Sequence, residues 1–181
     1  MDTKIKRILE YVFVIDKSKS MRGYEKMTAD LFNLMLEKPG RSYDETYVTT
    51  VLFDTESTVI YDRVTIDKVK KMTKGDYTAN GGTALVDALG DAIHRTVENQ
   101  KQLIEEDFPM HTVFVIVSDG NDDSSSKYSV DEVKTAMEKL IDNCRYEFIF
   151  AGTSKASMKA AKKIGILDDF IGTCSRILRG K

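Results

Sequence analysis

The chain has 181 residues and a mass of 20.4 kDa, a length that predicts a single domain over residues 1–181. Its hydrophobic content of 41% and charged content of 31% exclude a disordered chain. The 27 basic and 29 acidic residues nearly balance, which removes the positive charge that non-specific nucleic-acid binders need, and two cysteines are too few for a disulfide scaffold.

Neither a membrane span nor a secretion signal is visible in the sequence. The longest apolar runs, residues 11–15 and 112–117, are far shorter than the ~18 residues that cross a bilayer. Residues 1–10 contain charges but lack the apolar region of about 7–15 residues that signal peptides carry. We therefore expect a cytoplasmic protein.

The first half of the chain predicts a strand, a helix and a hairpin. Residues 11–15 are β-branched and aromatic with little polar alternation, as in strands buried on both faces of a parallel sheet. Apolar residues then recur at helical spacing over residues 27–35. Residues 47–53 and 57–61 are separated by three residues, a connection that permits only an antiparallel hairpin. A short helix is expected over residues 67–72.

The second half alternates helices and strands. Helices are expected over residues 85–97, 130–141 and 157–164, and buried strands over residues 112–117 and 147–151. Ser129 and Glu132 have the spacing of a capping box at the start of the middle helix. The order predicts an α/β fold: a doubly wound, Rossmann-like and mostly parallel sheet of about six strands, with one antiparallel edge strand and helices on both faces.

Three polar segments fall where such a sheet binds ligands, beyond the carboxyl ends of its strands. Asp16, Ser18 and Ser20 follow the first strand, and Asp119 follows the central strand. Thr83 opens the helix at 85–97, directly after two glycines that allow a sharp turn. We expect these three segments to meet at one edge of the sheet.

These five residues supply only hard oxygen donors. They offer three hydroxyls and two carboxylates, and no His or Cys is among them. Such a set fits Mg²⁺, with Mn²⁺ or Ca²⁺ as alternatives, and argues against zinc or copper. The sequence therefore predicts a divalent metal site made of Asp16, Ser18, Ser20, Thr83 and Asp119.

The same segments resemble a von Willebrand factor type A (VWA) domain. Their sequence is more similar to free-standing bacterial members than to animal receptor modules. The likeness covers residues 11 to about 177 and rests on the runs 16–21, 81–85 and 118–120. It implies a metal-ion-dependent adhesion site (MIDAS) in which Ser18, Ser20 and Thr83 touch the metal directly. Asp16 and Asp119 would act mainly through water, and a Glu or Asp of a protein partner would complete the octahedron.

The sequence departs from that family at Lys19, where many members have Gly. Lys19 therefore places a larger, charged side chain on the loop. Lys17, Lys19 and Arg22 flank the predicted site, either as a solvated face or as cations that attract an acidic partner. Asp122 and Asp123 are interpreted as a mobile acidic loop rather than as extra ligands.

We expect a non-enzymatic, Mg²⁺-dependent protein-binding module with no nucleic-acid ligand. One alternative is a Mg²⁺-dependent phosphatase of the haloacid dehalogenase type with Asp16 as nucleophile. That chemistry needs a second Asp two residues on as general acid–base, and Ser18 stands there. Another alternative, which the resemblance suggests, is an intracellular adaptor subunit beside an AAA+ ATPase.

Overall fold

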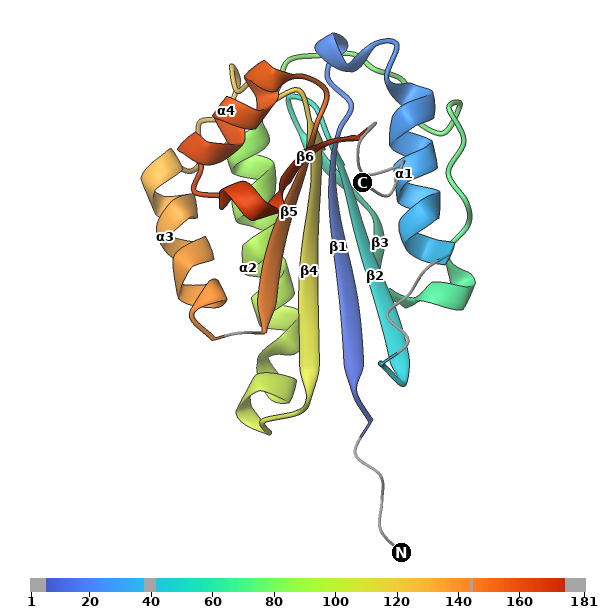
Figure 1. Ribbon diagram of the computed structural model, residues 1–181, viewed down its shortest axis with the longest axis vertical. Helices are drawn as coiled ribbons and strands as arrows, with labels where there is room; N and C mark the ends of the chain where they lie inside the picture. The colour runs from blue at the N-terminus through green and yellow to red at the C-terminus, as the bar shows by residue number, and fades with distance from the viewer. Residues whose placement is uncertain (1–5, 38–41, 144, 175–181) are drawn as a thin grey trace, which may run out of the picture.

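The fold is a single six-stranded sheet between layers of helices (Figure 1). The computed structural model describes residues 6–37, 42–143 and 145–174. The strands are β1 (Ile8–Asp16), β2 (Glu45–Phe53), β3 (Ser57–Thr65), β4 (Met110–Ser118), β5 (Tyr146–Gly152) and β6 (Ile171–Thr173). Their order is β3-β2-β1-β4-β5-β6, and only the β2–β3 pair is antiparallel. This architecture confirms the predicted fold class and the predicted hairpin.

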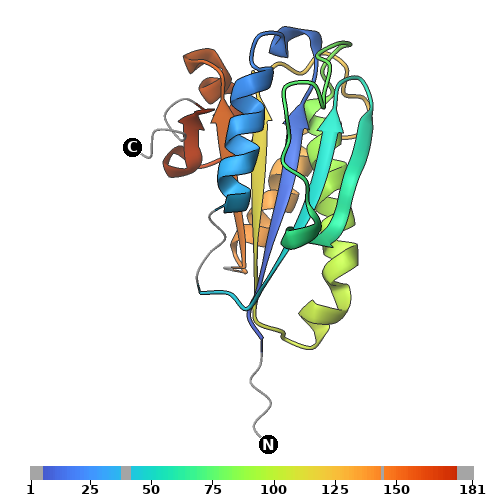
Figure 2. The ribbon, with the colours of Figure 1, turned by 90° about the vertical axis from the view of Figure 1, so that its right-hand side faces the viewer.

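Helices cover both faces of the sheet. They are α1 (Glu25–Glu37), α2 (Leu85–Glu105), α3 (Val130–Ile141) and α4 (Lys155–Lys163), with short 3-10 turns η1 (Lys19–Met21), η2 (Ile66–Lys68) and η3 (Asp168–Phe170). Helix α1 covers one face, and α2 and α3 cover the other (Figures 1 and 2). The four predicted helices at 27–35, 85–97, 130–141 and 157–164 are confirmed.

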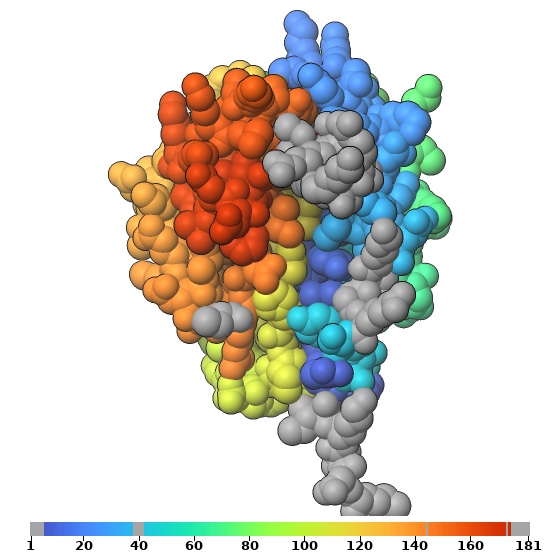
Figure 3. Space-filling view, viewed as in Figure 1, coloured from blue at the N-terminus to red at the C-terminus, as the bar shows by residue number. Residues whose placement is uncertain are grey.

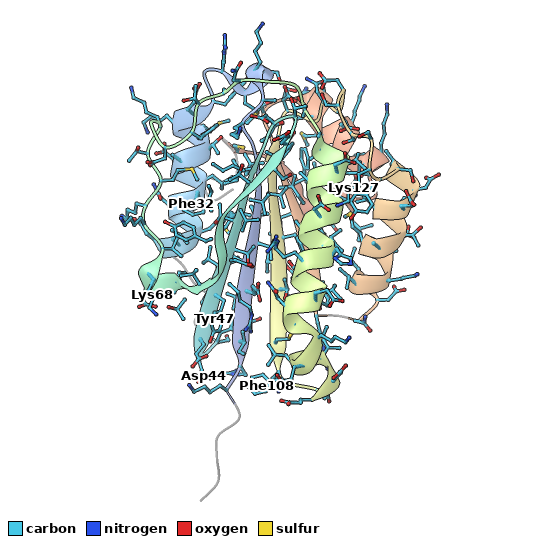
Figure 4. The ribbon with its side chains drawn as sticks, turned by 180° about the vertical axis from the view of Figure 1, so that it is seen from behind. Phe32, Asp44, Tyr47, Lys68, Phe108 and Lys127 are labelled. Atoms are coloured by element: carbon cyan, nitrogen blue, oxygen red, sulfur yellow. The ribbon has the colours of Figure 1, made fainter. Side chains whose placement is uncertain are left out.

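The central strands β1 and β4 are buried on both sides, which explains their continuous apolar sequences, whereas the edge strand β3 is partly exposed. On one face Phe32 of α1, labelled in Figure 4, packs on Phe13 of β1 with ring centroids 4.7 Å apart. On the other face Phe114 of β4 stacks on Phe148 of β5 at 4.5 Å, beneath α2 and α3. Every residue of β1 is buried, so this strand forms the centre of the core.

The helix predicted over residues 67–72 is wrong apart from the 3-10 turn Ile66–Lys68. Val69, which follows this turn, is extended. Three residues later the side chain of Asn33 on α1 holds the backbone of Met72: Asn33 Nδ2 donates to Met72 O at 2.8 Å, and Met72 N donates to Asn33 Oδ1 at 2.9 Å. These two hydrogen bonds to α1 satisfy the backbone N–H and C=O of Met72, which in a helix would bond to other backbone groups of the same helix.

The capping box predicted at the start of α3 is confirmed. Glu132 N donates to Ser129 Oγ at 3.2 Å, and Ser129 N donates to Glu132 Oε2 at 2.8 Å. These two bonds fix where the helix begins after the loop that leaves β4.

A charged group lies in the interior near the amino-terminal end of β1, away from the carboxyl ends of the strands. The Glu10 side chain of β1 is 2% exposed and accepts hydrogen bonds from Arg63 Nε at 3.2 Å and from Gln100 Nε2 at 2.8 Å. Thr49 Oγ1 donates to the other oxygen of Glu10 at 3.2 Å. This network links β1, the hairpin and α2, and it satisfies a carboxylate that would otherwise be costly to bury.

No helix in the part of the chain that the structure describes is long and apolar enough to cross a membrane.

Candidate metal site

The site lies where the direction of winding reverses, between the two central strands. Asp16 is the last residue of β1 and Ser118 is the last residue of β4, and the pairing of Ile15 with Val117 sets them side by side. Asp16 Oδ2 accepts a hydrogen bond from Ser118 Oγ at 2.7 Å, and Asp16 Oδ1 accepts one from Ser18 N at 2.8 Å. Both carboxylate oxygens are thereby fixed in orientation at the switch point of the sheet.

Asp16 is fully buried, and this sets its ionisation. Burial raises the pKa of the Asp16 carboxyl above its usual value, and the hydrogen bonds from Ser18 and Ser118 only partly offset this rise. The charge of Asp119 raises the pKa of Asp16 further, which places the two carboxylates within electrostatic reach of each other. A buried carboxylate with a second carboxylate in electrostatic reach favours a bound cation.

The loop after β1 brings two serine hydroxyl groups close together. Ser18 Oγ and Ser20 Oγ lie 3.1 Å apart across the 3-10 turn η1. Ser18 is fully buried, whereas Ser20 is exposed, so the pair opens toward solvent. The Lys19 side chain is exposed and its backbone N donates to Gly81 O at 3.2 Å. Lys19 therefore fits where many family members have Gly.

The segment that carries Thr83 is tied to this loop through its backbone. Asn80 N donates to Lys17 O at 2.8 Å, and Gly81 adopts a φ of +75°, which favours glycine there. Thr83 is 2% exposed and directly precedes Ala84, the N-cap of α2. Its backbone N donates to Asp123 Oδ1 at 2.7 Å. Thr83 is thus held in place from both sides.

Asp119 is partly exposed at the mouth of the site. Its carboxylate accepts hydrogen bonds from Asn121 N and Asn121 Nδ2, both at 3.0 Å. Gly120, with a φ of +84°, follows it, and a Cβ there would meet Ala160 Cβ of α4 at 2.7 Å. The close packing of α4 on Gly120 fixes the turn from which Asp119 projects.

Asp122 and Asp123 are exposed, as expected of an acidic loop, and both are also hydrogen-bonded to the backbone at the start of α2. Asp122 Oδ1 accepts from Val86 N at 3.4 Å, next to the bond between Asp123 and Thr83 N. Asp87 in the first turn of α2 accepts from Tyr128 N at 2.9 Å and from Ser126 N at 2.8 Å. Lys127, which lies beside α2 in Figure 4, also donates its N to Asp87 at 3.0 Å.

The five predicted residues are therefore not all in direct contact with one another. Asp16, Ser18 and Ser20 form one connected set, and Asp119 is near enough to influence the charge of Asp16. Thr83 joins them through the backbone bonds of the 80–83 segment. The donors remain hydroxyl and carboxylate oxygens, and no cluster of three His, Cys, Asp or Glu side chains occurs among the described residues. This donor set fits Mg²⁺ and does not fit zinc.

Sequence reasoning missed Ser118 as a residue of the site. Its hydroxyl donates to Asp16 and accepts from Gly120 N at 3.0 Å, so it orients the Asp16 carboxylate and links it to the turn that follows Asp119. The only signal was a hydroxyl at the end of a buried strand, next to Asp119.

We expect Ser118→Ala to weaken Mg²⁺ binding by about 10- to 100-fold, the usual cost of losing a group that orients a metal ligand. The strand still ends in a small residue, so the fold is retained. Calorimetric titration with MgCl₂ measures the effect, with Ser126→Ala as a control in which a hydroxyl is lost outside the site. Equal affinities of Ser118→Ala and wild type would contradict this role.

We expect Asp87→Ala to lower the free energy of unfolding by about 2 kcal/mol, since it removes several hydrogen bonds to a charged acceptor. Burial alone would raise the pKa of Asp87, but the amides of Ser126, Tyr128 and Lys127 together lower it. A lowered folded-state pKa gives stability that is complete above the unfolded value, about 3.9, and that is lost as the pH falls through the folded value. Urea unfolding at pH 7 and pH 3 should show a wild-type advantage that shrinks at pH 3. A constant difference would contradict this account.

A protein-family model described as "VWA domain containing CoxE-like protein" matches residues 2–159. The chain belongs to this family. It is a VWA domain, as the fold and the runs at 16–21, 81–85 and 118–120 indicate. No curated protein matches the chain.

Solved structures share the fold of this VWA domain. A von Willebrand factor type A protein from Catenulispora acidiphila has a TM-score of 0.67 and 18% identity over 97% of this chain, which corresponds to 41% of its own length. An aerotolerance-related membrane protein from Bacteroides fragilis has a TM-score of 0.59 and 10% identity, covering 95% of this chain and 96% of its own. Manganese-loaded TRAP protein from Plasmodium vivax has a TM-score of 0.56 and 14% identity, covering 96% and 71%. At these identities the likeness shows the fold alone.

Proposed function

We propose that this VWA domain binds Mg²⁺ through Asp16, Ser18, Ser20, Thr83 and Asp119, and binds a Glu or Asp of a protein partner at the same point. The observation that carries the proposal is the connected set at the end of β1. A buried carboxylate is oriented by Ser118, and two hydroxyl oxygens lie 3.1 Å apart beside it. The manganese-loaded state of the structurally similar TRAP protein supports a divalent ion.

The chemistry of the donors favours an anionic oxygen from outside the chain. Ser18, Ser20 and Thr83 contribute neutral hydroxyls, so the two carboxylates provide all the negative charge of the site. When bound, Mg²⁺ supplies a hard Lewis acid that forms a short directional bond to a carboxylate. The exposed positions of Ser20 and Asp119 leave the approach to that bond open from the solvent side.

The same arrangement favours binding over hydrolysis. A phosphatase with Asp16 as nucleophile requires a free carboxylate oxygen and a nearby general acid. Here both Asp16 oxygens are engaged, one by Ser118 and the other by Ser18 N. The hydroxyl of Ser18 lies beside Ser20 and does not titrate near neutral pH. We therefore propose a non-enzymatic module.

Affinity capture from the native host tests the proposal. Immobilised wild-type protein is used with 5 mM MgCl₂ and with EDTA, and an Asp119→Ala bait is used with MgCl₂. We expect a partner that is retained only by wild type with Mg²⁺. The purified partner is then mutated at its acidic residues, one of which should be essential. Equal retention in EDTA, or by the Asp119→Ala bait, would contradict the proposed function.

A further inference from the structure

A hollow of about 490 Å³ lies beside the candidate metal site, between the start of α1 and the loop that runs toward Thr83. It is lined by Arg22, Gly23, Glu25, Lys26, Lys74, Tyr77, Thr78 and Ala79. Figure 3 shows the blue segment around η1, which borders the hollow, projecting from the top of the molecule. The hollow is open to solvent and has room for an acidic side chain with its hydration.

The hollow and the site are formed by adjoining parts of the same two chain segments. Arg22 follows η1, the turn that carries Ser20, and Arg22 Nε donates to Ala79 O at 3.1 Å. Ala79 is followed directly by Asn80, whose N is bonded to Lys17 O. Tyr77 lines the hollow, and its pKa is raised to about 12, chiefly by burial and in part by the charges of Glu25 and Asp16. A single segment of a partner can therefore reach both places.

Positive charge dominates this hollow. Arg22, Lys26 and Lys74 are exposed, and Glu25 is the single acid among the lining residues. Glu25 Oε2 is engaged by Gly23 N at 2.8 Å. Lys26 pairs with Asp30 in an exposed i,i+4 contact of 2.6 Å, a kind of pair that contributes little and exchanges easily. Lys74 makes no ion pair with any described residue.

Among the residues that line the hollow, three cations face one carboxylate, and the exposed Asp76 beside Tyr77 accepts a hydrogen bond from Thr73 N. Lys17 is paired with Asp54, and Asp123 accepts from the start of α2. The whole chain has a net charge of −2, so the positive charge around the hollow comes from the local arrangement of its side chains and not from the overall composition.

We propose that the hollow is a second recognition point for the partner that the proposed function requires. The partner segment carries two acidic residues: one binds at the metal, and the other enters the hollow lined by Arg22, Lys26 and Lys74. This inference rests on the proposed function and narrows its partner to an acidic segment. A second contact made by an already bound segment adds affinity because it is intramolecular.

Peptide titrations followed by ¹⁵N NMR test this inference on the whole chain with saturating MgCl₂. The probes are Gly/Ser peptides with one Glu, and matched peptides with a second Glu placed two to six residues away on either side. We expect the best two-acid peptide to bind about fivefold more tightly than the one-acid peptide, with added shifts at Lys74 and Ala79.

Two charge-reversal variants distinguish binding in the hollow from non-specific electrostatic attraction of the acidic peptide to the protein. In Lys74→Glu the gain from the second Glu should vanish. In Lys159→Glu, an exposed cation on α4 with the same change in charge, the gain should remain. Equal binding of one-acid and two-acid peptides, or equal loss in both variants, would overturn the inference. The one-acid peptide reports on the proposed function separately, because that function fails if EDTA leaves its shifts at Ser18, Ser20 and Thr83 unchanged.

Discussion

Asp119→Ala should bind Mg²⁺ at least about 100-fold more weakly than the wild-type protein, a loss of ~2.7 kcal/mol. Asp119 and Asp16 provide the negative charge of the site, and a carboxylate a few ångströms from a divalent cation in a partly buried setting accounts for a loss of this size. Removing one carboxylate also relieves the repulsion that raises the pKa of Asp16. The fold should survive, because Asp119 is partly exposed and, among the described residues, its side chain is hydrogen-bonded only to Asn121.

Isothermal calorimetry with MgCl₂ measures this loss. Asp131→Ala is the matched control, since it removes an exposed carboxylate from the first turn of α3, which contributes none of the five site residues. Its affinity should equal that of wild type. Similar affinities of Asp119→Ala and Asp131→Ala would mean that the ion binds elsewhere.

Glu10→Ala should lower the free energy of unfolding by about 3 kcal/mol, as expected when one partner of a buried ion pair is removed. The change leaves Arg63 and Gln100 without the acceptor that they share in the interior. For a chain of this length the thermal midpoint should fall by roughly 10 °C. Mg²⁺ affinity at 15 °C should be unchanged, because Asp16 lies six positions after Glu10 along β1, about 20 Å away.

Differential scanning calorimetry measures the thermal midpoint of Glu10→Ala. Glu98→Ala is the control, since it removes an exposed glutamate from α2, and its midpoint should stay within about 2 °C of wild type. A wild-type midpoint for Glu10→Ala would show that the interior network contributes nothing.

The strands were predictable because burial on both faces produces continuous apolar runs, as in β1 and β4. The end of β3 was not predictable from this rule. It continues to Thr65 through Asp62 and Arg63, and Arg63 adopts a φ of +50° beside a register shift at Thr50. Its guanidinium is drawn toward Glu10, a contact between residues 53 positions apart that no local pattern reveals.

In the candidate site, too, features set by local sequence were predictable and features set by long-range contacts were not. The spacing of Asp16, Ser18 and Ser20 is local, so the sequence predicts that they share one loop, and the structure places their polar groups in contact. The roles of Ser118 and Asp123 depend on contacts across strands and across loops. Ser118 reaches Asp16 only because of the β1–β4 register, and Asp123 reaches Thr83 from 40 residues away.

The central claim is that the segments after β1, before α2 and after β4 hold one divalent ion. The most direct measurement is paramagnetic broadening of ¹⁵N NMR signals by substoichiometric Mn²⁺, with Mg²⁺ added afterwards to compete. We predict that the amides of Ser18, Ser20, Thr83 and Asp119 broaden first and together, and that Mg²⁺ restores them. Broadening centred on another part of the fold, or confined to one of these segments, would contradict the claim.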